Sequence, residues 1–323
     1  MDDAVIRPYH AGDEAAINDA FNAVFGADRA LAEWAWKFQG EPEGRWIMVA
    51  VAPHGEVLAQ YAAVPARFKV DDRVVRAGQL VDVFTRREAR RGLATGRLFL
   101  ETVRRFFVDF GAPDRLAVQY GFPGERHLRL GVGHLGYGEM PLQPVGYWVR
   151  PARRRGSAFT GHRVRSGLDR AAADDLWRRA APRYRVGVVR DAAWLLRRFT
   201  GRPGVEYQHL SAWRRGRVHA WAVVRVRETA VAWAELVWDG EDPGALAALD
   251  RAIAGRARAA GVGEVELWLM GDGEAETALA RLGWTRGEQP QGLNVGGRSF
   301  HPDIAMAAFP GRLYVTMGDA DLV

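Results

Sequence analysis

The chain has 323 residues, 48% of them hydrophobic and 26% charged, which excludes an intrinsically disordered protein and favours two folded domains over one. Its complete lack of cysteine excludes disulfides, thiolate metal sites and a cysteine nucleophile, and we expect no bound metal. The net charge of +6 rests on arginines that are interspersed with acidic residues, so we do not expect nucleic acid as a partner.

The first half of the chain alternates between strand-like and helix-like segments. Apolar residues at helical spacing precede Gly26, which is a suitable helix stop, and the later strand-like runs are rich in β-branched residues. We predict strands at 4–9, 45–52, 56–70, 76–85 and 115–122, and helices at 12–26, 27–39, 93–111 and a short one ending at Leu135-Gly136-Tyr137.

The same order of segments recurs in the second half, after an arginine-rich stretch with Pro, Gly and Ser. Trp194 stands in a helix-like segment as Trp34 does, and both halves end on Leu-Gly-aromatic. We therefore predict an internal duplication, and we expect the closing segment to fold back onto the first domain. The predicted boundaries are a first domain at 1–150, a linker at 151–161, a second domain at 162–308 and a C-terminal tail at 309–323.

The segment 81–103 carries the strongest chemical signal. A buried strand runs into a loop with Arg90, Arg91 and Gly92, and a helix starts at once. The first amides of a helix lack partners within it and lie at the positive end of its dipole. Because Gly92 permits close approach of the backbone, and the arginines add charge-assisted contacts, the loop can hold an anion such as a pyrophosphate.

This segment resembles the acetyl-CoA-binding motif of the GNAT superfamily of N-acetyltransferases, written Arg/Gln-x-x-Gly-x-Gly/Ala. Gly92-Leu93-Ala94 matches its second half, whereas Ala89 stands where Arg or Gln is usual. Either Arg90 or Arg91 takes that role in a shorter loop, or the register is Arg91-x-x-Ala94-x-Gly96. Both alternatives place the pyrophosphate over residues 90–96.

The resemblance implies an α/β (α+β) fold of two tandem GNAT-like domains, each a mixed, mostly antiparallel twisted sheet flanked by helices. It implies that acetyl-CoA binds the first domain, where two central strands splay apart and the pantetheine arm bonds to the backbone like an added strand. The implied coenzyme-binding residues are Val83, Phe84, Thr85, Arg90, Arg91, Gly92, Leu93, Ala94, Thr95 and Gly96.

The second half departs from this pattern at the corresponding place. It reads VWDGEDPG before its long helix, with acidic residues and no arginine-rich glycine loop. Because those carboxylates would repel a pyrophosphate, we expect the second domain to bind no coenzyme. We expect it to support the first domain and to wall the acceptor pocket.

Acyl transfer to an amine needs a base for the amine and an acid for the leaving thiolate. The resemblance implies a tyrosine acid at position 132, but Val132 stands there. Asp82, inside an apolar strand, is a candidate base or else an aspartate tied to backbone amides. His127 is a candidate proton carrier or an ordinary helix residue, and Tyr120 a candidate acid or a core tyrosine.

The leading hypothesis is an acetyl-CoA-dependent N-acetyltransferase that acts directly on a primary amine of a small molecule. One alternative is an aminoacyl transferase of the Fem type, which uses charged tRNA, although no heptad run is present. Another is a non-catalytic CoA-binding protein, which the missing tyrosine favours. We expect a cytoplasmic protein without membrane association, because no signal peptide or spanning segment is evident, and a homodimer is compatible with the sequence.

Overall fold

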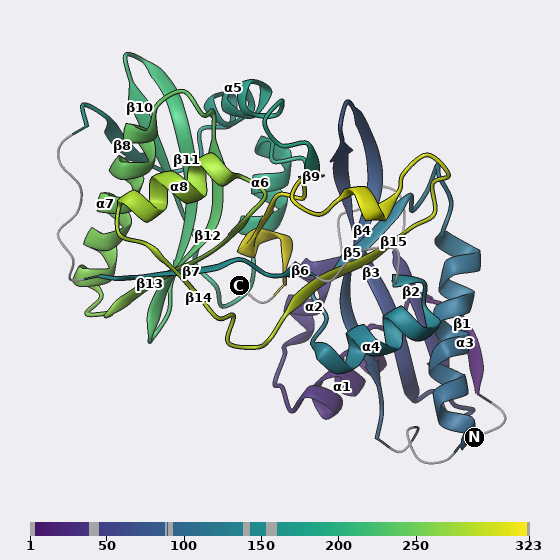
Figure 1. The fold of residues 1–323 in the computed structure, drawn as a ribbon. Helices are drawn as coiled ribbons and strands as arrows, with labels where there is room; N and C mark the ends of the chain where they lie inside the picture. Colours follow the sequence, from purple (N-terminus) through teal and green to yellow (C-terminus); the bar gives the residue numbers. More distant parts are fainter. Residues whose placement is uncertain are drawn as a thin grey trace. The chain divides into compact units, whose positions relative to one another are not determined.

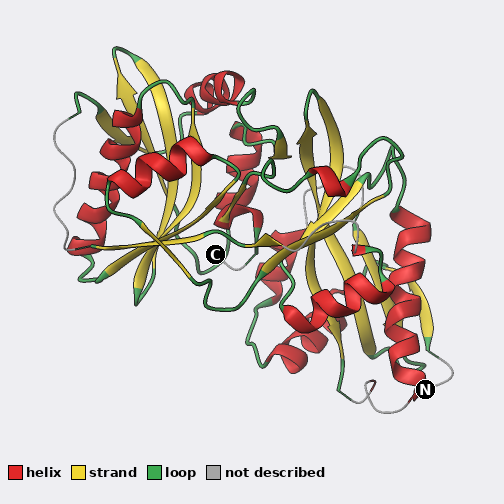
Figure 2. Ribbon diagram, in the orientation of Figure 1, coloured by secondary structure: helices red, strands yellow, loops and turns green. Residues whose placement is uncertain are grey.

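The computed structural model describes residues 4–38, 45–87, 89, 93–137, 143–152 and 160–321. The chain forms two compact units, and each is a twisted sheet with helices packed against it (Figures 1 and 2). The first unit comprises Met1–Arg67, Val75–Leu142 and Asn294–Ala308, and the second comprises Phe68–Val74, Gln143–Leu293 and Phe309–Val323.

The division of the chain differs from the expected boundaries, because the units exchange segments. Asn294–Ala308, expected in the second domain, belongs to the first unit. The tail, expected to fold back onto the first domain, belongs to the second unit. The physical reason is that a short strand satisfies the free edge of either sheet, and which edge it joins is a non-local choice.

The first unit is built on a mixed sheet in which β1, β2, β3, β4, β5 and β15 are neighbours in that order. Strands β1 and β2 pair antiparallel, as do β2 and β3, whereas β4 and β5 pair parallel. Its elements are β1 (Val5–Pro8), α1 (Glu14–Phe25), α2 (Leu31–Phe38), β2 (Trp46–Val51), β3 (Val57–Val70), β4 (Arg73–Thr85), α3 (Leu93–Phe110), β5 (Val118–Gly121), α4 (Glu125–His134), β15 (Asn294–Ser299) and the 3-10 turn η3 (Met306–Ala308).

Two apolar clusters cover the two faces of the first sheet. Alternation along β3 places Ala62 in one cluster with α1 and α2, and Tyr61 in the other with α3. We call these the α1/α2 face and the α3/α4 face. Leu135 and Tyr137, which follow α4, belong to the second cluster. Both faces of the sheet are therefore buried within this unit.

The second unit repeats the plan, with neighbours in the order β14, β7, β13, β12, β11, β10 and β8. Its central pair, β12 and β13, is parallel, and the other pairs along this path are antiparallel. Its elements are β6 (Gln143–Pro144), β7 (Tyr147–Pro151), β8 (Arg163–Ser166), α5 (Arg170–Ala180), β9 (Val186–Val188), α6 (Ala192–Phe199), β10 (Gln208–Arg214), β11 (Arg217–Val226), β12 (Ala230–Trp238), α7 (Pro243–Ala259), β13 (Glu264–Met270), α8 (Gly273–Arg281), β14 (Thr285–Gly287), β16 (Val315–Thr316) and η4 (Met317–Asp319).

Local sequence signals account for the principal elements. Helix α1 ends at Gly26 as predicted, since Gly26 adopts a φ of 62° that favours glycine. Helix α3 starts at Leu93, as predicted. Over the described part of the chain, none of the helices combines the length and the apolar character needed to cross a membrane.

Candidate functional site

The parallel strands β4 and β5 part in the middle of the first sheet. Their pairing runs from Ala77 opposite Val118 to Gln79 opposite Tyr120 and ends there. Strand β4 nevertheless continues to Thr85. Within the described ranges, β4 has only β3 and β5 as neighbours, so the stretch Leu80–Thr85 has no strand on its β5 side. Backbone groups of this stretch are available to an extended ligand.

Asp82 lies within that unpaired stretch and departs from strand geometry. Its φ is 50°, in the left-handed region that a non-glycine residue adopts rarely and asparagine or aspartate most readily. The Gln60 side-chain amide donates to the Asp82 carbonyl at 2.9 Å. The backbone of β4 therefore turns at Asp82 and is held there by a buried hydrogen bond.

Two cations hold the Asp82 carboxylate. Arg29, between α1 and α2, donates to one oxygen at 2.5 Å, and Lys37 of α2 donates to the other at 2.7 Å. All three residues are buried. The structure thus anchors Asp82 through side chains of the α1/α2 face, whereas the alternative to a base role had backbone amides as its anchors. Both oxygens of the Asp82 carboxylate are therefore engaged in buried ion pairs.

Sequence reasoning missed Arg29 and Lys37, although Lys37 left a signal. It is one of two lysines in the chain. It lies at helical spacing with Trp34 and Phe38, which are buried on the apolar side of α2. A lysine on the apolar stripe of a short helix needs a buried anionic partner, and Asp82 is that partner.

Buried polar atoms on the α1/α2 face lack hydrogen-bond partners. They include Gln60 Oε1, Gln79 Nε2 and Trp34 Nε1. Buried polar groups are usually satisfied, so a group of them beside a parting of strands is typical of a site that a ligand completes. These residues line the sheet face on which the Asp82 carboxylate is held.

Tyr120 lies where β4 and β5 stop pairing. It is buried, and its ring contacts Phe122 edge-on at 6.3 Å. Because residues opposite each other in a sheet share a face, Tyr120 points to the same side as Gln79. Two of the three candidate catalytic residues, Asp82 and Tyr120, are therefore on the α1/α2 face.

His127 lies on the opposite face. Its ring, on α4, contacts Phe99 at 6.4 Å and Tyr137 at 6.2 Å between centroids, and both residues belong to the α3/α4 cluster. Burial lowers the pKa of His127, which keeps its imidazole neutral at pH 7. The structure does not bring His127 together with Asp82. Val132, where the tyrosine acid was expected, is on α4 and 47% exposed.

The expected phosphate-binding residues divide into two groups. Arg90, Arg91 and Gly92 lie outside the described residues. Leu93, Ala94, Thr95 and Gly96 form the first turn of α3, so their backbone amides are at the amino end of an 18-residue helix. Val83, Phe84 and Thr85 are in the unpaired stretch of β4, with the Phe84 side chain buried against the Phe25 ring.

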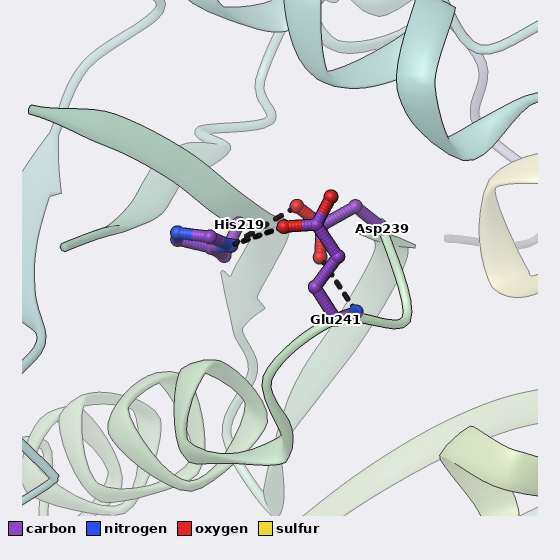
Figure 3. A group of neighbouring side chains, drawn as sticks. All are labelled: His219, Asp239 and Glu241. Carbon is purple, nitrogen blue, oxygen red and sulfur yellow. Dashed lines mark hydrogen bonds and ion pairs between the residues drawn. The ribbon is translucent and has the colours of Figure 1, made fainter. Parts of the chain in front are cut away.

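The second unit carries an acidic cluster at the corresponding strand-to-helix turn, between β12 and α7. Figure 3 shows His219, Asp239 and Glu241. The side-chain nitrogen or oxygen atoms with which they could hold a metal ion lie within 4.8 Å of one another. Asp239 also pairs with Arg179, and Glu241 pairs with Arg217 at 2.9 Å. The cluster is therefore a charge-compensated ion-pair network, in which the arginines oppose binding of a cation.

The amino end of α7 is closed to an anion by its own cap. Asp242 accepts from the Gly244 amide at 2.8 Å, and Pro243 lacks an amide hydrogen. A pyrophosphate at this helix end would meet the Asp242 carboxylate instead of unpartnered amides.

A family model and solved structures relate the chain to acyltransferases. The model described as an acetyltransferase (GNAT) domain matches residues 5–109. No curated protein sequence matches the chain significantly. Because the match covers β1 to α3, it includes the unpaired stretch of β4 and the first turn of α3.

Three solved structures show that the fold extends over both units. GCN5-related N-acetyltransferases from Anabaena variabilis and Kribbella flavida superpose with TM-scores of 0.65 and 0.63 at 12% and 17% identity. Each covers 92% of this chain, which spans 73% and 71% of theirs. Saccharomyces cerevisiae N-myristoyltransferase with bound myristoyl-CoA gives a TM-score of 0.58 at 12% identity, over 92% of this chain and 83% of its own.

Proposed function

Because residues 5–109 match the family model described as an acetyltransferase (GNAT) domain, we propose that the protein transfers an acetyl group from acetyl-CoA to a primary amine of a small molecule. The observation that carries this proposal is the parting of β4 and β5. Pairing ends at Gln79 opposite Tyr120, and β4 continues to Thr85 with one side unpaired. A pantetheine arm, which bears two amide groups, fits there as an added strand.

The coenzyme is held at three points along this half of the molecule. The backbone of Val83–Thr85 bonds the pantetheine amides. The first turn of α3, Leu93–Gly96, offers its unpartnered amides to the pyrophosphate, and Arg90 and Arg91 add charge-assisted contacts. The amine enters on the α1/α2 face, where Gln60, Gln79 and Trp34 have unsatisfied polar atoms.

Transfer proceeds directly in a ternary complex. The amine nitrogen attacks the thioester carbonyl carbon, the C–N bond forms, and collapse of the tetrahedral intermediate breaks the C–S bond. Tyr120, at the end of the β4–β5 pairing, gives its proton to the leaving thiolate, and the proton that the attacking nitrogen loses passes through water to restore the Tyr120 hydroxyl. Asp82 has a positioning role: held by Arg29 and Lys37, it fixes the turn of β4 that separates the strands.

Titration with acetyl-CoA tests the coenzyme assignment, with a control that the duplication supplies. Arg90→Ala and Arg91→Ala should each weaken binding about tenfold, as expected for a charge-assisted contact. Arg214→Ala and Arg217→Ala, in the second unit, should leave it unchanged. Calorimetry and the rise in melting temperature give the affinity. The proposal would be removed if millimolar acetyl-CoA gave no stabilisation. It would also be removed if the Arg214 and Arg217 variants lost as much affinity for acetyl-CoA as the Arg90 and Arg91 variants.

A non-catalytic CoA-binding function is the second candidate, because Asp82 is occupied by two cations. It differs from the first in one observable: coenzyme binds, but no thiol is released. Release of free CoA with a panel of primary amines distinguishes them. Turnover that falls at least tenfold in Tyr120→Phe, with acetyl-CoA affinity retained, supports the enzyme.

A further inference from the structure

The central strands of the second unit part in the same way as those of the first. Strands β12 and β13 pair in parallel from Ala230 opposite Glu264 to Trp233 opposite Leu267. Beyond that point β12 continues to Trp238 and β13 to Met270. In a GNAT-like unit this is the place that corresponds to the unpaired stretch of β4.

The end of the chain occupies this place in the second unit. All residues from 313 to 320 are buried. Strand β16 pairs antiparallel with β13, with Leu269 opposite Thr316. The Tyr314 hydroxyl donates to the Leu236 carbonyl of β12 at 2.6 Å. The segment therefore bonds to both parted strands, and Figure 1 shows this yellow end of the chain beside β12.

Buried charges hold the segment in one register. Arg190 Nε donates to Glu235 Oε1 of β12 at 3.0 Å, and its other end pairs with Asp319 of the segment. Thr316 Oγ1 donates to the second Glu235 oxygen at 2.9 Å. The side chains of Arg190, Glu235 and Asp319 are at most 2% exposed. Because buried charges are tolerated only with good geometry, this network penalises any shift of the segment.

The fit also depends on a small residue at position 318. A β-carbon on Gly318 would lie 2.6 Å from Glu235 Oε2 and 2.9 Å from the Phe199 ring. Arg198 donates to the Gly318 carbonyl at 2.9 Å. The segment is thus recognised through its backbone, a glycine, the Asp319 carboxylate and the hydroxyls of Tyr314 and Thr316.

We propose that the parted strands β12 and β13 form a binding site for an extended peptide strand, filled by residues 313–320 of the same chain in place of a coenzyme arm. The comparison with a coenzyme arm rests on the function proposed for the first unit. The ligand class is a peptide with a glycine before an acidic residue, which pairs with Arg190. The chain consequently binds one coenzyme, not two.

A cut in the connection to the segment tests this site in the full-length chain. Gly311 is exposed, and a β-carbon there would have no neighbour within 4 Å, so a protease recognition sequence can be inserted at this position. After cleavage, native mass spectrometry should find the 312–323 peptide still bound. A labelled synthetic 312–323 peptide should exchange into the cut protein. Loss of the peptide from a protein that keeps its circular dichroism spectrum overturns the proposal.

Substitution of Asp319 tests the register. Asp319→Asn should weaken retention of the peptide at least about tenfold, because Arg190 loses a buried partner. Asp303→Asn, at an exposed acidic residue before the segment, is the matched control. Equal retention in the two variants contradicts the proposal. If Asp319→Asn does not fold, exchange of the labelled peptide into the cut wild-type chain decides the question.

Coenzyme stoichiometry separates this proposal from the function proposed above. Calorimetry with acetyl-CoA should give one site per chain. Two sites would overturn the filling of the second unit by the segment. Absence of any site would remove the acetyltransferase proposal, while peptide retention would still decide whether the strand site exists.

Discussion

Asp82 shows how one residue joins the fold to the proposed chemistry. Its left-handed backbone turns β4, and its carboxylate ties that turn to Arg29 and Lys37. An aspartate is suited to this position because it combines tolerance of a positive φ with a charge that two buried cations require. The residue therefore acts through backbone geometry, and a base role would leave both cations without a partner.

Asp82→Asn should destabilise the protein by about 3–5 kcal/mol, because it leaves Arg29 and Lys37 as uncompensated buried cations. Asp13→Asn should cost at most about 1 kcal/mol, since its pair with Arg7 is partly exposed. Denaturant unfolding measures both. If Asp82→Asn kept full stability and instead shifted the acidic limb of the pH–rate profile, Asp82 would be the base after all.

Glu235 should make the stability of the protein depend on pH. Burial raises its pKa from 4.5 to about 7, an effect that Arg190 opposes and Asp319 reinforces. The folded state then binds a proton that the unfolded state releases, so this contribution is complete below pH 4.5 and is lost as pH rises to about 7. Glu235→Gln should remove that part of the slope in unfolding experiments between pH 4.5 and 7. If the difference in free energy of unfolding between variant and wild type stayed constant from pH 4.5 to 7, Glu235 would not be the source of this pH dependence.

At the scale of elements, the sequence predicted those helices and strands that are determined by local apolar patterns. Helix α3 begins at Leu93 and β3 spans Val57–Val70, as the apolar periodicity indicated. The GNAT resemblance and the tandem α/β fold were confirmed. The sheet partners of β7 and β15 could not be predicted, because strands of five and six residues fit any free sheet edge. The ion pairs of Asp82 could not be predicted from the sequence either, since Arg29 is 53 residues away along the chain.

Close packing beside the β4–β5 pairing gives an element-scale prediction. A β-carbon on Gly78 would lie 2.8 Å from the Ala63 β-carbon and 2.9 Å from Leu116 Cδ1. Gly78→Ala should therefore cost about 1–3 kcal/mol through overpacking. Gly133→Ala on α4 is the control, because its β-carbon would meet nothing within 4 Å and alanine favours a helix. Equal stability of the two variants would show that β4 and β5 are not packed as described.

At the scale of the whole molecule, the two units share a plan and differ in what fills it. The first has the unpaired stretch of β4 and, at the start of α3, the helix amides of Leu93–Gly96. The second has a capped α7 and a strand of its own chain in the corresponding place. The two units of one plan thus carry one proposed coenzyme site in a single chain.

Interleaving of the chain predicts that the first half does not fold well alone. A fragment of residues 1–150 lacks β15, which pairs with β5 from Gly296 opposite Gly121 to Ser299 opposite Val118. The fragment should expose that edge and aggregate or melt well below the full chain. Addition of a 294–308 peptide should raise its melting temperature. A monomeric fragment as stable as the full chain would refute the exchange of segments.

The central claim is that the unpaired stretch of β4 in the first unit takes the pantetheine arm of acetyl-CoA. A crystal structure of the complex tests it most directly. We expect the pantetheine amides on the backbone of Val83–Thr85 and the pyrophosphate over Leu93–Gly96. A nucleotide bound instead beside Asp239 in the second unit, or side chains filling the place next to β4, would contradict the account.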